Sequence, residues 1–231
     1  MSSEPPQKPF DVDQVMRRVR EAARPYPKPA LFALADQGFK TPFEQLVACI
    51  ISIRTRDEVT EPVAAELFRH ARTPAEMSRL APEEIDRWIR RSTYHQAKAP
   101  QILAIARRIL HDYGGELPCD DDVLRSFEGV GPKCANLVLA IACGRPRIAV
   151  DTHVHRVALR LGWIPPGTTA ETAHRVLGPA VPPGIRYDLH VALIEHGRTV
   201  CKAQRPRCGA CVLRDECAHG RETAGAERAG R

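Results

Sequence analysis

Lys133 and Asp151 are the residues of this 231-residue sequence whose types and surroundings best suit catalysis. Lys133 follows the turn Gly129-Val130-Gly131, in which glycine permits positive φ angles, and a helix is expected to begin there. The first N–H groups of a helix and the positive end of its dipole can hold a phosphate, and the same field makes an amine a better nucleophile. Asp151, farther along the chain, supplies a carboxylate. Together these groups indicate chemistry on a nucleic acid.

Each of these signals also has an ordinary structural explanation. A lysine in the first turn of a helix is usually just solvated. Asp151 with Thr152 is typical of a helix N-cap ahead of an apolar stripe that starts at Val154. These positions alone therefore leave both catalysis and plain helix capping open.

Four cysteines near the C-terminus have the spacing of a ligand set. Six, two and five residues separate the members, which are Cys201, Cys208, Cys211 and Cys217. Thiolates hold structural zinc as well as iron–sulfur clusters, and the spacing alone does not separate the two. Disulfides are a third possibility, disfavoured because nothing marks the chain as secreted. The segment therefore predicts a metal centre.

Helices have to position these residues, and the spacing of apolar side chains predicts roughly ten of them. A first helix is expected from about Asp11, and the proline-rich stretch 25–29 after it is interpreted as a connector. The next helix is expected at Pro42, because Thr41 is a good N-cap. Strand signals are weak throughout, so the sequence predicts an all-α protein.

The composition suits a globular protein with a polyanionic partner. Hydrophobic residues make up 43% of the chain, the net charge is +6 and the isoelectric point is about 9.0. The N-terminus has no secretory signal, and the apolar runs are too short to cross a bilayer. We therefore expect no membrane partner and a cytoplasmic, nucleoid-associated protein whose thiols stay reduced.

Taken together, the motifs resemble those of the endonuclease III family, helix–hairpin–helix DNA glycosylases with AP lyase activity. The matching residues are, in order, Gly129-Val130-Gly131-x-Lys133, Val150-Asp151-Thr152-His153, His196-Gly197-Arg198 and the cysteine spacing. The resemblance runs from roughly Phe10 to Cys217. It implies a [4Fe–4S] cluster on the four clustered cysteines, with Lys133 as nucleophile and Asp151 as its catalytic partner.

The resemblance also implies a two-lobed fold, with a six-helix lobe and a cluster lobe that bind DNA between them. The expected divisions are a disordered tail 1–9, the cluster lobe 10–35 and 148–217, the six-helix lobe 36–147 with the helix–hairpin–helix motif at about 120–143, and a flexible tail 218–231.

Two loops of the chain depart from the family pattern where the DNA is read. Arg54 stands where the family usually has a glutamine that fills the emptied base stack. Tyr94 takes the place of an apolar wedge and is expected to stack on a base. Glu128 replaces a common proline before the hairpin. These changes leave the chemistry intact and the range of lesions open.

Other contacts to DNA are expected from the hairpin and from a basic loop. Gly129, Val130 and Gly131 are predicted to bind the DNA backbone, and the basic loop between the first two clustered cysteines is predicted to bind phosphates through Lys202, Arg205 and Arg207. His153 is assigned DNA or capping contacts at most. His196 is expected to pack near the cluster without being a ligand.

The sequence is therefore interpreted as a base excision repair enzyme that works as a monomer on damaged duplex DNA. The expected reaction is removal of oxidised pyrimidines such as thymine glycol, followed by β-elimination through a Schiff base on Lys133. One alternative is a relative with another lesion or mismatch specificity, including a monofunctional glycosylase. A second alternative is a non-catalytic or redox-sensing iron–sulfur protein that binds DNA.

Overall fold

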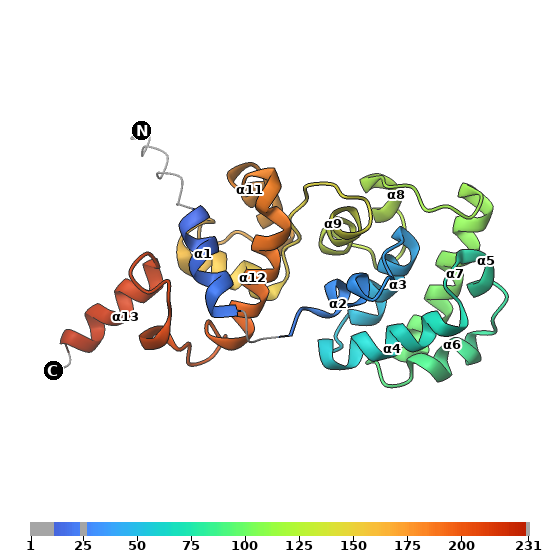
Figure 1. Ribbon diagram of the computed structural model, residues 1–231, viewed down its shortest axis with the longest axis horizontal. Coiled ribbons are helices and arrows are strands. Elements are labelled where there is room, and N and C mark those ends of the chain that lie inside the picture. Colours follow the sequence, from blue (N-terminus) through green and yellow to red (C-terminus); the bar gives the residue numbers. More distant parts are fainter. Residues whose placement is uncertain (1–11, 24–26, 230–231) are drawn as a thin grey trace. The chain divides into compact units, whose positions relative to one another are not determined.

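The computed structural model describes residues 12–23 and 27–229, and every regular element in those ranges is a helix (Figure 1). The all-α prediction is confirmed. The chain forms two compact units, a central unit Pro27–Ala149 and a terminal unit that joins Met1–Tyr26 to Val150–Arg231. The tail predicted at residues 1–9 lies outside the described residues. No helix in the described part of the chain is both long and apolar enough to cross a membrane.

The central unit is built around α3, which is buried along nearly its whole length and packs against α4, α7 and α9. Thr41 caps α3 as expected: its hydroxyl accepts the N–H of Glu44, and the Glu44 carboxylate accepts the N–H of Thr41. The helices of this unit are α2 (Ala30–Asp36), α3 (Pro42–Ser52), α4 (Asp57–His70), α5 (Pro74–Met77), α6 (Pro82–Ile89), α7 (His95–Tyr113), α8 (Asp121–Arg125) and α9 (Pro132–Ile141).

Helix α2 was missed by the sequence prediction, which placed no helix between the proline-rich stretch and Pro42. It has seven residues, too few to show a clear helical period, and it follows directly after Pro29. Leu31, Phe32 and Leu34 are buried, and the helix packs against α3 and α4. Burial against neighbouring helices, rather than local propensity, therefore accounts for this element.

The terminal unit places α12 against α1 and α10. An added Cβ at Gly197 of α12 would come within 2.9 Å of the Cβ of His153 on α10, so glycine permits the close approach of the two helices. The elements of this unit are α1 (Val12–Ala23), α10 (Thr152–Leu161), α11 (Ala170–Ala180), η1 (Pro183–Ile185), α12 (Arg186–Thr199), η2 (Cys208–Ala210) and α13 (Ala218–Ala229).

The segment predicted as a flexible tail, 218–231, forms helix α13 over Ala218–Ala229, and its flexibility stays a prediction. The segment is rich in alanine, which favours helix formation, although it also contains Gly220 and Gly225 and lacks an apolar stripe that would predict a helix. It packs against α10 at its start, where the Cβ of Ala218 lies 3.7 Å from the position a Cβ would take at Gly162.

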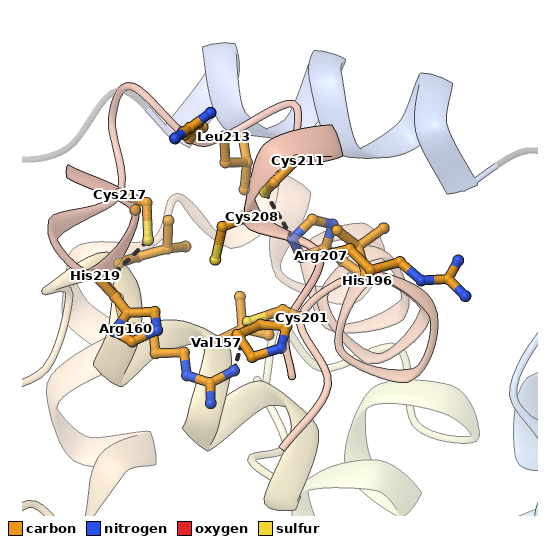
Figure 2. Close-up of a pocket in the computed structure, with 15 residues that line it drawn as sticks. Val157, Arg160, His196, Cys201, Arg207, Cys208, Cys211, Leu213, Cys217 and His219 are labelled. Carbon is orange, nitrogen blue, oxygen red and sulfur yellow. Dashed lines mark hydrogen bonds between the residues drawn. The ribbon is translucent and has the colours of Figure 1, made fainter. Parts of the chain in front are cut away.

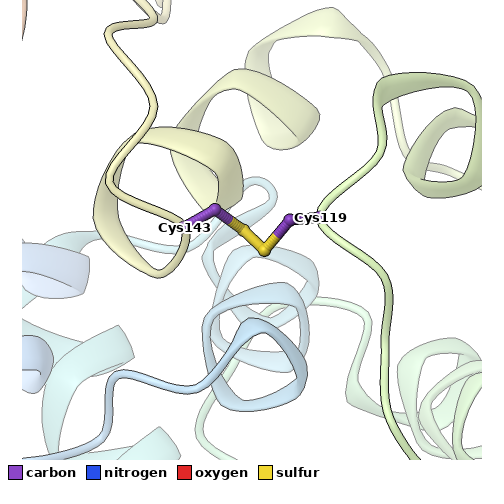
Figure 3. Close-up of a disulfide and its surroundings, with 2 residues drawn as sticks. All are labelled: Cys119 and Cys143. Carbon is purple, nitrogen blue, oxygen red and sulfur yellow. A yellow bond between two sulfur atoms is a disulfide. The ribbon is translucent and has the colours of Figure 1, made fainter.

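A disulfide joins Cys119 to Cys143, with the Cα atoms 5.9 Å apart (Figure 3). The first cysteine precedes α8 and the second follows α9, so the bond brackets the helix–hairpin–helix segment. The expectation that the thiols stay reduced is therefore wrong for this pair. Separated by 24 residues in sequence, the two cysteines meet only because the fold returns α9 to the start of α8.

Candidate functional site

The hairpin between α8 and α9 is a tight turn that requires glycine at one position. The backbone N–H of Val130 bonds to the carbonyl of Phe127 at 3.1 Å, and Gly129 has a φ of +76°. An added Cβ at Gly129 would lie 2.6 Å from Nε2 of Gln101, a clash on top of the unfavourable backbone. Gly131 is the N-cap of α9, and no side chain caps that helix start.

Helix α7 holds this hairpin in place from one side. Gln101 Nε2 donates to the carbonyl of Glu128 at 2.6 Å. The guanidinium of Arg108 donates to the carbonyl and the hydroxyl of Ser126, both at 2.8 Å, and stacks over the ring of Phe127 at 4.6 Å. The turn is therefore fixed before any ligand binds.

Lys133 is exposed in the first turn of α9, while the next residue faces the core. Cys134 and Cys49 of α3 form a buried thiol pair. Their mutual hydrogen bond lowers the pKa of Cys49 and raises the pKa of Cys134, and the positive charge of Lys133 acts on both thiols. The ammonium thus stands at the surface directly above the packed interface of α3 and α9.

Asp151 is the N-cap of α10. Its Oδ1 accepts the backbone N–H of His153 at 2.9 Å and of Val154 at 2.8 Å. The capping interpretation is therefore correct, and Oδ2 remains as a second acceptor on the same carboxylate. Lys133 lies in the central unit and Asp151 in the terminal unit.

The two histidines named in the sequence serve the packing of the terminal unit. His153 is half-buried, and its Nδ1 lies 3.2 Å from Nη2 of Arg156. His196 is buried, and burial lowers its pKa to about 4, so it is neutral. Its Nε2 lies 3.6 Å from the Sγ of Cys211.

The four clustered cysteines are free thiols that line one pocket (Figure 2). Val157 and Leu161 of α10, together with Leu213, supply apolar walls. Burial raises the pKa of Cys211 and of Cys217, and the other clustered thiolates raise both further. Crowded thiols of this kind are stable as thiolates only beside positive charge, which iron or zinc supplies.

Helix α10 ties the cysteine pocket to the basic loop. Arg160 Nη1 donates to the Sγ of Cys201 at 3.3 Å and to the carbonyl of Lys202 at 2.7 Å, while its Nη2 donates to the carbonyl of Ala203 at 3.0 Å. The thiol of Cys217 donates to the carbonyl of Arg160 at 3.2 Å. The loop is therefore attached to α10 at its base.

The four thiols of the pocket are the donors that an iron–sulfur cluster requires. In the ranges that the structure describes, no set of three or more His, Cys, Asp or Glu side chains is placed to bind one metal ion. A four-iron cluster instead takes one thiolate on each iron, which needs sulfur atoms spread around a larger cavity. The donor set and the cavity thus suit an iron–sulfur cluster.

The side chains predicted to read DNA are exposed, with one exception. Arg54 and Tyr94 are exposed, and each has a φ of 58°, in the left-handed region that few residues other than glycine adopt. Lys202, Arg205 and Arg207 are exposed as well. The side chain of Val130 is only 6% exposed, so this residue can meet DNA only through its backbone.

Comparison with known proteins agrees with this geometry. Residues 47–183 match the family model described as HhH-GPD superfamily base excision DNA repair protein, and residues 201–217 match the iron–sulfur binding domain of endonuclease III. Endonuclease III of Thermotoga maritima is 39% identical over 76% of this chain and 82% of its own length. The Escherichia coli protein is 37% identical over 88% of this chain and 93% of its own. The chain belongs to the endonuclease III family.

A solved relative shares the fold over nearly its whole length. The structure of a trapped endonuclease III–DNA covalent intermediate superposes with a TM-score of 0.75 and 32% identity, covering 92% of this chain and 98% of the other. As a member of this family, the chain is a DNA glycosylase and AP lyase of base excision repair with a [4Fe–4S] cluster. Its partner is DNA.

Sequence reasoning missed Lys98, which contacts the loop predicted to read DNA. It is buried in α7, and its ammonium binds the loop that carries Arg54. A signal was present, because Lys98 lies one helical turn before Ile102 and so occupies a core-facing position of an apolar stripe. A charged residue at such a position is unusual unless it has partners.

Proposed function

We propose that Lys133 is the nucleophile and Asp151 its catalytic partner, acting on an oxidised pyrimidine or an abasic site in duplex DNA. The observation that carries the proposal is the position of Lys133, exposed in the first turn of a helix that no side chain caps, directly after a rigid glycine turn. There the helix dipole opposes protonation of the amine and attracts a phosphate.

The first step replaces the glycosidic bond by a bond to the lysine. After the nucleotide has flipped out of the stack, the neutral amine of Lys133 attacks C1′ while the base leaves with the bonding electrons. The Asp151 carboxylate faces the developing positive charge and accepts the proton that the amine loses. The products are an N,O-acetal at C1′, which carries the lysine nitrogen and the ring oxygen, and the base, which leaves as an anion and takes up a proton from water.

The second step cuts the strand. The sugar ring opens to a Schiff base between Lys133 and C1′, which makes the proton on C2′ acidic. Loss of that proton expels the 3′ phosphate by β-elimination, and water then releases the lysine. The mechanism gains support from a solved relative, a trapped endonuclease III–DNA covalent intermediate.

DNA is held by both units in this proposal. The backbone of the turn Gly129-Val130-Gly131 binds a phosphate at the uncapped start of α9, and the basic loop of Lys202, Arg205 and Arg207 binds others. Arg54 and Tyr94 enter the space left by the flipped nucleotide. Cys201, Cys208, Cys211 and Cys217 hold the [4Fe–4S] cluster, whose part here is structural because glycosidic cleavage involves no net oxidation or reduction.

The proposal extends to the form in which the protein works. One chain carries both Lys133 and Asp151, so a monomer suffices for the reaction. Because the substrate is chromosomal DNA, we place the protein with the nucleoid in the cytoplasm.

Borohydride trapping on two duplexes tests this function. One duplex carries thymine glycol and the other an abasic site, and a covalent complex is expected on both. Lys133→Gln should abolish trapping while leaving the free energy of unfolding within about 0.5 kcal/mol, because the side chain is exposed. Trapping on the abasic duplex alone would mean that thymine glycol is not a substrate and that another lesion is. Strand cleavage that survives Lys133→Gln would rule out the assigned nucleophile.

A further inference from the structure

A buried lysine joins the two loops predicted to read DNA. Lys98 lies in the first turn of α7 and is only 4% exposed. Its Nζ donates hydrogen bonds to the carbonyl of Ile51 at 2.7 Å, to the carbonyl of Ile53 at 2.7 Å and to the hydroxyl of Thr55 at 3.2 Å. An ammonium group has three N–H donors, so these acceptors use all of them.

The acceptors lie on both sides of Arg54. Ile51 belongs to the last turn of α3, where the helix dipole favours a cation and the final carbonyls have no partner within the helix. Ile53 and Thr55 are the direct neighbours of Arg54, whose backbone is in the left-handed region. Lys98 therefore holds the chain just before and just after a strained residue.

The same contacts reach the loop that carries Tyr94. The hydroxyl of Thr55 also accepts the backbone N–H of Thr93 at 3.0 Å. Tyr94 is the N-cap of α7, and its carbonyl accepts the backbone N–H of Lys98 at 3.1 Å. The two loops thus form one hydrogen-bonded unit centred on Lys98 and Thr55.

Burying the Lys98 ammonium is unfavourable, and the hydrogen bonds to the loops are the feature that explains why a lysine stands there. Burial lowers the pKa of Lys98 to about 8, because the charged form loses its hydration. The three acceptors are neutral oxygens. A methionine of similar volume would fill the same space without that cost. What the lysine adds is therefore the ordering of the two loops.

We propose that Lys98 is a positioning residue that holds Arg54 and Tyr94 as one rigid pair, ready to enter the space that a flipped nucleotide leaves in the duplex. Both side chains are exposed, and both backbones adopt a conformation that persists only when the surroundings fix it. The inference rests on the proposed function, since it concerns engagement of the same duplex. Lys98 acts through the loops, and the chemistry at Lys133 does not require it.

The test compares a substrate that needs the loops with one that does not. A duplex with an abasic site presents a gap in the stack and an orphaned base, whereas a single strand with the same site presents neither. In Lys98→Met, kcat/KM for duplex cleavage should fall by about tenfold, mainly through KM, since hydrogen bonds from a charged group are lost. Borohydride trapping on the single strand should stay within about twofold, as for a change remote from the chemistry.

Two further measurements keep the result decisive. Lys40→Met removes an exposed lysine of the same unit and should change neither duplex cleavage nor trapping on the single strand. Thr55→Val removes the shared hydroxyl and should repeat the pattern of Lys98→Met with a smaller loss. A fluorescent base opposite the abasic site reports entry of the loop residues through its stacking, and its response should weaken in both variants.

The outcomes separate this inference from the function it rests on. The role of Lys98 would be overturned if Lys98→Met lost duplex cleavage and single-strand trapping by the same factor. It would also be overturned if the fluorescence response were the same as in the unaltered protein. Thr55→Val decides the matter if Lys98→Met folds poorly. Failure of the unaltered protein to trap on either substrate would instead count against Lys133 as the nucleophile.

Discussion

Two helices begin next to the residues proposed for catalysis, and they begin in opposite ways. α9 starts at Gly131, which has no side chain to cap the helix. α10 starts at Asp151, whose carboxylate accepts the N–H groups of His153 and Val154. One start is open to an anion from outside the protein, and the other is closed by a carboxylate of the protein itself.

This difference decides what a substitution can reveal at each helix. Lys133 projects from the open start, so its replacement changes chemistry at little cost to folding. Asp151 has two roles in our proposal, because the carboxylate that caps α10 also assists the reaction. Its replacement therefore mixes a loss of stability with a loss of catalysis, and variants that separate the two test the comparison.

The largest expected effect is the loss of catalysis in Asp151→Asn. Asparagine caps a helix about as well as aspartate, so the free energy of unfolding should change little, while the excision rate falls by about 10²–10⁴-fold. Asp151→Ala should lose the same activity and, in addition, about 1 kcal/mol of stability. Single-turnover excision and urea denaturation measure the two effects.

A control for the cap comes from α8. Asp120 caps that helix, since its Oδ1 accepts the N–H of Val123 at 3.0 Å, and Asp120→Ala should cost similar stability without the catalytic loss. Full activity in Asp151→Asn would mean that capping is the only role of Asp151.

The second effect concerns the cysteines near each helix. Cys119 and Cys143 on the α9 side are oxidised to a disulfide, whereas the clustered cysteines beside α10 are free thiols. The Cys119–Cys143 disulfide brackets α8 and α9, whereas α10 contacts thiols of the cluster pocket through Arg160. Replacing Cys119 and Cys143 by serine should lower the free energy of unfolding by about 2–4 kcal/mol, because the bond closes a long loop in the unfolded chain.

Reduction and cluster loss should be separable. Dithiothreitol should lower the melting temperature as the serine variant does, without bleaching the brown colour of the cluster. Cys201→Ser should weaken the colour while thiol counting still finds the disulfide. A melting temperature that is insensitive to reduction would show that the disulfide does not support the hairpin.

The parts of the site found in the sequence are those with local signals. The turn before Lys133, the cap at Asp151 and the spacing from Cys201 to Cys217 each lie within a short stretch, so chain geometry alone brings their members together. The helix starts follow from caps and prolines in the same way. Local rules therefore gave the positions of the proposed catalytic residues.

The parts that were missed depend on contacts between distant residues. Cys119 and Cys143 pair because α9 folds back, and α2 is helical because its apolar side chains are buried by α3 and α4. Lys98 is the clearest case, since its acceptors lie more than 40 residues before it in the chain. No local pattern specifies such contacts.

The smallest effect separates two ways of holding a phosphate. Arg205→Ala removes a cation from the basic loop, so the slope of log affinity against log salt should fall in magnitude by about 0.9.

The matching variant at the open start of α9 is Gly131→Ala. At Gly131, φ is −91° and an added Cβ meets no atom within 4 Å, so this variant should fold normally. A methyl group there would obstruct a phosphate at the open start of α9, and affinity should fall while the slope stays constant, because backbone N–H groups carry no formal charge. If Arg205→Ala and Gly131→Ala changed the salt slope equally, the basic loop and the open start of α9 would not hold phosphates in different ways. Unchanged affinity in Gly131→Ala would show that the open start binds no DNA.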